Sequence, residues 1–174
     1  MKKILVVVDM QNDFIDGSLG TAEARSIVKN VVNKIKDFDG EIFYTRDTHR
    51  DNYLNTLEGR NLPVIHCVEY TEGWKIKQEV MAASEGKQVV VIDKPTFGSL
   101  ELTQRIAEDL TDPLESIMLI GLCTDICVIS NAINLKSRFW ETPIIVDSSC
   151  CAGVTPQSHA NAIEAMKMCQ ITII

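Results

Sequence analysis

The chain has 174 residues, of which 45% are hydrophobic, enough to bury the core of one domain but too few for two comfortable ones. Its formal charge is -7 and it has no basic cluster, which argues against nucleic acid or an anionic membrane surface as a partner. We therefore expect a single domain over residues 1–174 that acts on small molecules or contacts other proteins.

Apolar runs rich in β-branched residues alternate along the chain with segments of helical spacing. The runs predicted as strands are residues 4–8, 41–45, 89–92, 117–120, 144–146 and 171–174. Helices are predicted near residues 21–38, 74–84, 98–110, 125–138 and 156–168, the last with Thr155 as cap and Pro156 in its first turn. This alternation favours the α/β class, a Rossmann-like three-layer αβα fold with a mostly parallel sheet of about six strands.

The cysteines and the N-terminus indicate where the protein works. Six cysteines lie mostly inside or beside apolar runs, so we expect free thiols rather than a disulfide framework. After Met-Lys-Lys only five apolar residues precede Asp9, too few for a signal-peptide core, and no run approaches the ~18–20 residues of a membrane span. A cytoplasmic location without membrane contact is expected.

Polar residues follow the predicted strands, where ligands bind in an open parallel sheet. We expect them on one rim of the sheet: Asp9, Asp47, Asp93 with Lys94, residues 121–127, and Asp147. The segment from Asp47 to Trp74 has no clear period and is long for a connection, which is typical of a functional loop.

Cys127 is the candidate nucleophile because it lies where a predicted strand passes into a helix. Unpaired amides and the helix dipole favour a thiolate there and bind the oxyanion that forms when the thiolate attacks a carbonyl. An isolated cysteine is more often a small core side chain. Asp9 as proton acceptor and Lys94 as a charge partner on the same rim favour the catalytic interpretation.

A second group of residues suits a metal. Asp47-Thr-His49 and the later His66 supply one carboxylate and two imidazoles, a set suited to zinc or another divalent transition metal. A loop histidine is the alternative for His49 taken alone.

The motifs together resemble those of the isochorismatase-like cysteine hydrolases, and within them the nicotinamidase-type amidases. The resemblance rests on Asp9-Met-Gln-Asn-Asp-Phe14, Asp93-Lys94, Gly121-Leu-Cys-Thr-Asp-Ile-Cys-Val128 and residues 147–159, and it covers essentially the whole chain. It implies the isochorismatase-like hydrolase fold, with Asp9 as general base, Lys94 as charge-stabilising partner and Cys127 as nucleophile. It also implies that the backbone amides of Cys123 and Cys127 form the oxyanion hole, beside a cis peptide at Leu122–Cys123.

The resemblance further implies a metal bound at Asp47, His49 and His66 that contacts the pyridine ring of the substrate. Glu58 matches an extra carboxylate ligand of some members, and Phe14 matches an aromatic residue of the substrate pocket. We expect Phe97 to supply another wall. Members are commonly dimers or tetramers, so a homo-oligomer is expected.

The leading hypothesis is an amidohydrolase that converts nicotinamide to nicotinate and ammonia through a thioester. Asn61-Leu62 stands where members commonly carry a tryptophan before the later histidine, and residues 95–98 also depart from the pattern. Another small amide, an N-carbamoyl compound or an enol ether is therefore the alternative substrate. A thiol redox protein is a different class, weakened because Cys123 and Cys127 do not form a Cys-x-x-Cys motif. A non-catalytic binding module is disfavoured because all three catalytic positions are filled.

Overall fold

The computed structural model describes residues 1–110 and 112–174 and contains a six-stranded, all-parallel sheet in the order β3-β2-β1-β4-β5-β6. The strands are β1 (Lys2–Val8), β2 (Glu41–Asp47), β3 (Val89–Lys94), β4 (Leu114–Leu122), β5 (Ile144–Ala152) and β6 (Thr172–Ile173). Every predicted strand is present, and the predicted α/β fold class is confirmed.

The long helices also match the predicted segments. They are α2 (Ala22–Asp37), α5 (Leu100–Glu108), α6 (Ile129–Arg138) and α7 (Pro156–Met168). A capping box at Thr155 and the first-turn Pro156 begin α7, as the sequence indicates. Within the described residues, no helix has the length and apolar character that crossing a bilayer requires.

The short helices were predicted less well. Residues 74–84 contain only α4 (Gln78–Ala82), while α1 (Asn12–Ile15), a 3₁₀ turn (Tyr53–Asn55) and α3 (Leu57–Asn61) were not predicted. Helices of one turn carry little hydrophobic periodicity, and their packing against the rest of the fold stabilises them.

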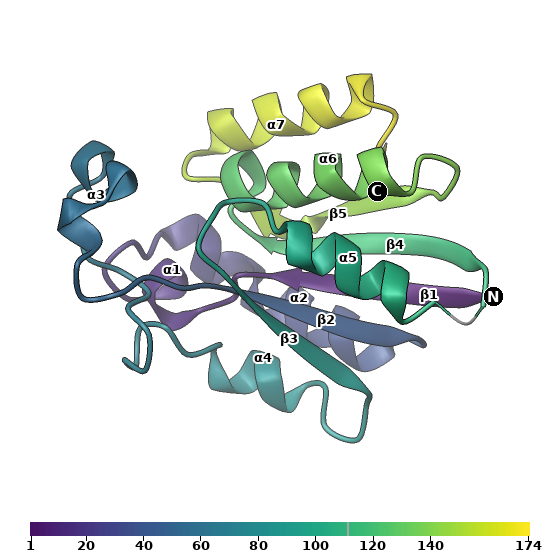
Figure 1. Ribbon diagram of the computed structural model, residues 1–174, viewed down its shortest axis with the longest axis horizontal. Helices are drawn as coiled ribbons and strands as arrows, with labels where there is room; N and C mark the ends of the chain where they lie inside the picture. The colour runs from purple at the N-terminus through teal and green to yellow at the C-terminus, as the bar shows by residue number, and fades with distance from the viewer. Residues whose placement is uncertain (111) are drawn as a thin grey trace.

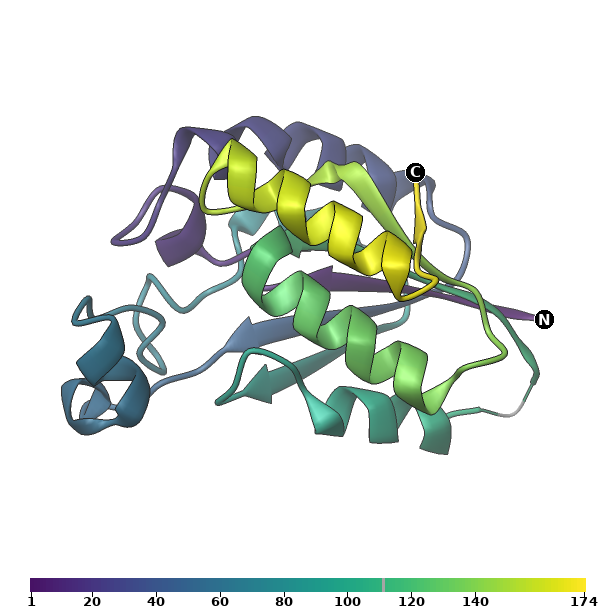
Figure 2. The same ribbon diagram turned by 90° about the horizontal axis from the view of Figure 1, so that it is seen from above.

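The two faces of the sheet bury separate apolar clusters. Alternate residues of β1 point to opposite faces: Ile4, Val6 and Val8 pack with α5, α6 and α7, while Leu5 and Val7 pack with α2 and α4. Figures 1 and 2 show the resulting three layers, and they show α3 beyond the carboxyl ends of the strands. β1 lies between β2 and β4, so the strand order reverses beside it, which is where ligands bind in such sheets.

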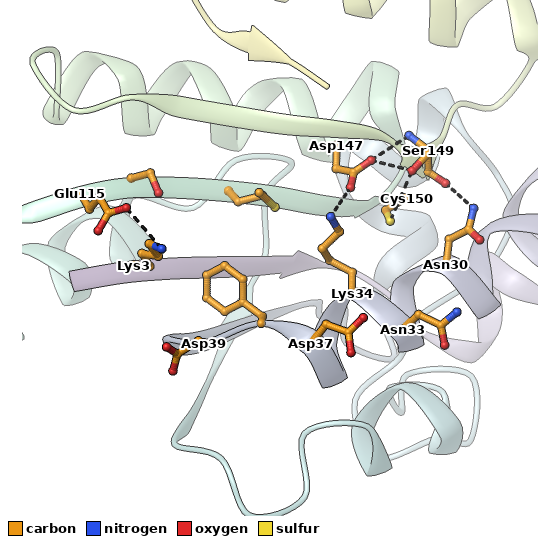
Figure 3. Close-up of a pocket in the computed structure, with 13 residues that line it drawn as sticks. Lys3, Asn30, Asn33, Lys34, Asp37, Asp39, Glu115, Asp147, Ser149 and Cys150 are labelled. Carbon is orange, nitrogen blue, oxygen red and sulfur yellow. Dashed lines mark hydrogen bonds and ion pairs between the residues drawn. The ribbon is translucent and has the colours of Figure 1, made fainter. Parts of the chain in front are cut away.

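Asp147 does not lie on the rim, so that prediction was wrong. β5 runs on to Ala152, and its register with β4 jumps from Leu119↔Val146 to Gly121↔Cys151. In this irregular stretch Asp147 turns toward α2, where it pairs with Lys34 at 2.8 Å and accepts a hydrogen bond from the Ser149 hydroxyl (Figure 3). The sequence does not reveal such an irregularity, because it depends on pairing with a distant strand.

The predicted free thiols are confirmed. All six cysteines are unpaired, including the adjacent Cys150 and Cys151.

Candidate active site

Asp9, Lys94 and Cys127 meet at the carboxyl ends of the central strands. Asp9 follows β1, Lys94 ends β3, and Cys127 lies in a π-helical turn (Thr124–Val128) that joins β4 to α6. Lys94 Nζ lies 2.6 Å from Asp9 Oδ2 and donates a hydrogen bond to Cys127 Sγ at 3.5 Å. The exposed fractions are 0% for Asp9, 1% for Lys94 and 5% for Cys127, so the three groups interact largely out of water.

Thr45 on β2 orients the Asp9 carboxylate. Its hydroxyl donates a hydrogen bond to Asp9 Oδ1 at 2.6 Å, and its carbonyl accepts the Asp9 amide at 3.2 Å. Asp9 itself has a φ of 46°, in the left-handed region that non-glycine residues seldom adopt. The neighbouring strand therefore holds the carboxylate where Lys94 meets it. Thr45 was not predicted as a site residue, because its partner is far away in the chain.

The turn that carries Cys127 has an irregular pattern of backbone hydrogen bonds. The carbonyl of Cys123 accepts hydrogen bonds from the amides of Ile126 and Val128, at 3.1 and 3.0 Å. The peptide bond between Leu122 and Cys123 is cis, as the resemblance implied. Cys127 is thus in the first turn of the helical segment, where amides lack intrahelical partners.

Burial changes the acid–base properties of these groups. Burial and the Asp9 charge raise the pKa of Cys127 well above its ordinary value, and Lys94 opposes them. Burial also raises the pKa of Asp9, again against Lys94. Burial disfavours charge on Lys94 too, but Asp9, Cys127 and Asp47 outweigh it and raise the Lys94 pKa. Burial and Asp9 thus oppose the thiolate that the position of Cys127 led us to expect, and Lys94 favours it.

Asp47, His49, Glu58 and His66 form a second cluster next to this group. One ligand atom from each lies within 4.8 Å of the others. Asp47 Oδ2 is 2.9 Å from His49 Nε2 and 3.4 Å from His66 Nε2, and Glu58 Oε1 is 3.6 Å from His49 Nε2. His66 Nδ1 lies 2.8 Å from the carbonyl of Val64, which leaves Nε2 to face the cluster. Two carboxylates and two imidazoles have the donor chemistry of a divalent transition-metal site.

Two residues near β1 hold this cluster in place. The buried Gln11 exchanges hydrogen bonds with the backbone of Asp47, accepting its amide at 2.7 Å and donating to its carbonyl at 2.8 Å. The Asp13 carboxylate accepts the amide of Cys67, the residue after His66, at 2.8 Å. Both belong to the motif of residues 9–14, but their contacts are to segments far away in the chain and could not be predicted from it.

A cavity of about 240 Å³ lies between the two clusters. Its polar side includes Asp47, Glu58, His66, Cys123 and Cys127. Its apolar walls are Phe14, Leu19, Leu62, Phe97, Ile126 and Val154. The two predicted pocket residues, Phe14 and Phe97, both line it. A small, mostly apolar molecule with one polar group at each end fits this arrangement.

Asp93 lies at the rim but outside the cavity. Its carboxylate forms a two-point ion pair with Arg46, at 2.6 and 2.9 Å, on the partly exposed edge of the sheet. Only its neighbour Lys94 contributes to the site.

Comparison with known proteins agrees with this geometry. The isochorismatase domain model matches residues 3–174. The chain belongs to the isochorismatase family. The nicotinamidase of Saccharomyces cerevisiae is 23% identical to it, over 99% of each chain. The structure of Pyrococcus horikoshii pyrazinamidase in complex with zinc is 25% identical, with a TM-score of 0.83, over 100% of this chain and 99% of that one.

These relatives bear out the family and the enzyme class that the motifs indicate, a hydrolase acting on a non-peptide C–N bond. The fold alone is shared more widely. The N-carbamoylsarcosine amidase of Thermoplasma acidophilum superposes with a TM-score of 0.74 at 24% identity, over 99% of this chain and 95% of that one. Fold similarity therefore leaves the substrate of this chain open.

Proposed function

We propose that this protein is a cysteine amidohydrolase whose leading substrate is nicotinamide, which it converts to nicotinate and ammonia. The observation that carries the proposal is the position of the Lys94 ammonium, 2.6 Å from Asp9 and 3.5 Å from Cys127. Cys127 in turn lines a cavity together with Asp47, Glu58 and His66. An acid–base group, a nucleophile and a substrate-sized space thus occur together.

The first half of the proposed reaction forms a thioester. The Asp9 carboxylate takes the proton of the Cys127 thiol as sulfur attacks the amide carbon, and Lys94 stabilises the charge that the pair shares. The amides of Cys123 and Cys127 donate hydrogen bonds to the oxyanion of the tetrahedral intermediate. Asp9 then returns its proton to the nitrogen, the C–N bond breaks, and ammonia leaves.

The second half hydrolyses that thioester. The Asp9 carboxylate takes a proton from a water molecule, whose oxygen attacks the carbonyl carbon. The C–S bond breaks, the sulfur regains a proton from Asp9, and the acid leaves. Because Cys127 begins and ends as a thiol, its raised pKa matches the proposed cycle: the proton moves only when the carbonyl is in place.

Asp47, His49, Glu58 and His66 fit a divalent metal, and we propose that they hold zinc. All four donors belong to types that zinc accepts, and they converge within 4.8 Å. When bound, the metal supplies a Lewis acid for a lone pair of the substrate, such as that of a pyridine nitrogen. Gln11 and Asp13 keep the ligand-bearing segments in position through the backbone bonds described above.

The direct test is ammonia release from nicotinamide by the purified protein. Wild type should release one ammonia per nicotinate, and Cys127→Ala should release none above background. Thioester formation would appear as a mass increase on the peptide containing Cys127 after rapid acid quenching. Activity that survives Cys127→Ala unchanged would reject the mechanism.

A related hydrolase with another substrate is the second candidate. A hollow of about 580 Å³ shares the lining residues Glu58, Leu62, Phe97 and Ile126 with the cavity, and this proximity favours a substrate with a substituent beyond a single ring. A panel of small amides, N-carbamoyl compounds and isochorismate, assayed beside nicotinamide, distinguishes the two. We also propose that the protein is a homo-oligomer of single-domain subunits. Sedimentation velocity measures the number of subunits.

A further inference from the structure

Asn131 is a buried polar residue on α6 with an exposed fraction of 0%. Its Nδ2 donates hydrogen bonds to the carbonyl of Cys127 at 2.8 Å and to the carbonyl of Phe97 at 3.2 Å. Its Oδ1 accepts the amide of Ser99 at 2.9 Å. Both Nδ2 contacts are carbonyl oxygens and the Oδ1 contact is an N–H, so the surroundings determine the orientation of the side-chain amide.

The contacts of Asn131 join two segments that are far apart in the chain. One is the π-helical turn that contains Cys127. The other is the loop of residues 95–99, which connects β3 to α5. A side chain that bonds the loop on both sides of Gly98 and the turn at Cys127 fixes the distance between them.

The loop carries two parts of the site. Lys94 Nζ donates a hydrogen bond to the carbonyl of Thr96 at 3.1 Å, and Phe97 forms a wall of the cavity. Phe97 has an exposed fraction of 48%, so the loop's own packing restrains this wall only in part. A shift of the loop would therefore move the cavity wall and one of the Lys94 partners together.

The loop also lies very close to α6. A Cβ atom at Gly98 would lie 2.6 Å from Asn134 Nδ2, so that this side chain would have to shift, and 3.2 Å from Ser130, which is tighter than most Cβ contacts. The contact between the loop and α6 is thus tight, and Asn131 supplies the hydrogen bonds within it.

We propose that Asn131 is a positioning residue for the hydrolytic site: it holds the loop of residues 95–99 on the Cys127 turn, and so sets the place of Phe97 and of the carbonyl that anchors Lys94. The inference rests on the proposed function in taking Cys127 as the nucleophile. It adds a reason why Phe97, which forms a wall of the cavity, keeps a constant position relative to Cys127.

Two substitutions separate the bonds of Asn131. Asn131→Ala removes all of them. Asn131→Ser leaves a hydroxyl that can donate to the Cys127 carbonyl one turn earlier on the helix, but is too short to reach the loop. Asn134→Ala is the matched control, because Asn134 lies on the same helix, contacts the loop at Gly98 and makes no hydrogen bond to the Cys127 turn in the described part of the chain.

Kinetics on nicotinamide give the first readout. We expect Asn131→Ser and Asn131→Ala to lower kcat/KM by about tenfold, mainly through a higher KM, and Asn134→Ala to stay within about twofold of wild type. Phe97→Ala should have little further effect in the Asn131→Ser background, because both changes act through the same wall. A merely structural role would lower the melting temperature and leave KM unchanged well below it.

Alkylation of Cys127 by iodoacetamide, followed by mass spectrometry of its peptide, gives a readout that needs no substrate. We expect alkylation to be several-fold faster in both Asn131 variants, because the loosened loop exposes the buried thiol. If wild type fails to hydrolyse nicotinamide, the proposed function fails while this measurement still tests Asn131. Wild-type KM and alkylation rate in folded Asn131→Ser would overturn the inference, even if Asn131→Ala were impaired. Should Asn131→Ala not fold, Asn131→Ser decides alone.

Discussion

Replacement of Thr45 by valine should shift the pH dependence of catalysis. The Thr45 hydroxyl donates a 2.6 Å hydrogen bond to the buried Asp9 carboxylate, and this bond lowers the pKa of Asp9 against the effect of burial. Valine has nearly the same shape but no donor, so the carboxylate loses the bond without a large change in packing. The pKa of Asp9 should therefore rise further.

The size of the shift follows from the strength of such bonds. Hydrogen bonds to charged groups contribute roughly 1.5–3 kcal/mol, and one pKa unit corresponds to about 1.36 kcal/mol. Thr45→Val should raise the pKa of Asp9 by about one to two units on this scale. Since the ionised carboxylate is the proposed base, the acid limb of the kcat/KM profile should move to higher pH by that amount.

The assay is the initial rate of ammonia release from nicotinamide, measured from acid to weakly basic pH. Thr45→Ser keeps the hydroxyl and serves as the control, with a profile expected to follow wild type. Metal content is measured for each variant, because Thr45 lies close in sequence to Asp47. The hydroxyl stabilises the charged form in the folded state, so Thr45→Val should also lower the free energy of unfolding above the Asp9 pKa. That loss should shrink at acid pH, where Asp9 is protonated.

A Thr45→Val profile that superimposes on wild type, with unchanged metal content, would refute this reasoning. It would mean either that Asp9 is not the base or that its ionisation does not limit the rate.

Three further predictions concern other parts of the site and fold. Cys123→Ser should retain most of the activity that Cys127→Ala abolishes, because the proposed role of Cys123 uses its backbone amide; a strong loss in Cys123→Ser would implicate its thiol. His66→Ala should lower zinc affinity by more than the ~10–100-fold that loss of an outer-shell partner costs, as measured by competition with a chelator; unchanged zinc content would place the metal elsewhere. Asp147→Asn should lower the free energy of unfolding near neutral pH by about 1 kcal/mol, a modest value because Lys34 is partly exposed. Burial opposes charge on Asp147, but Lys34 and Ser149 outweigh it and lower the Asp147 pKa. The difference in unfolding free energy between wild type and Asp147→Asn should therefore be complete above the ordinary carboxyl pKa of about 3.9, and it should disappear as pH falls through the lower pKa of the folded state. A difference that does not change with pH in urea titrations would contradict this.

The strands were predictable because their signal is local. Runs such as residues 4–8 are short, apolar throughout and rich in β-branched residues, which is typical of a strand covered on both faces. The cap at Thr155 is local in the same sense, since its partner Ser158 lies three residues away. Asp147 failed for the opposite reason: the irregular register of β5 depends on its pairing with β4.

In the candidate site, too, the features that depend on neighbouring positions were predictable and those that depend on distant contacts were not. The sequence shows an acid, an amine and a thiol at Asp9, Lys94 and Cys127, each just after or at the end of a strand. Because a parallel sheet brings the ends of its strands to one rim, these residues could be predicted to lie together. The roles of Thr45, Gln11 and Asn131 could not be predicted from the sequence, because each forms hydrogen bonds with partners 30 or more positions away. The raised pKa of Cys127 was likewise not predictable from the sequence, since burial is its main cause.

The sequence by itself determined the α/β architecture, the free thiols and the set of reactive side chains, since hydrophobic pattern and residue type are properties of neighbouring positions. Only the tertiary structure decided which polar residues face the cavity, which carboxylate turns away to a structural ion pair, and which buried amides hold the reactive groups in place. Those outcomes depend on distances between segments remote in the chain and on the exclusion of water, and folding alone creates both.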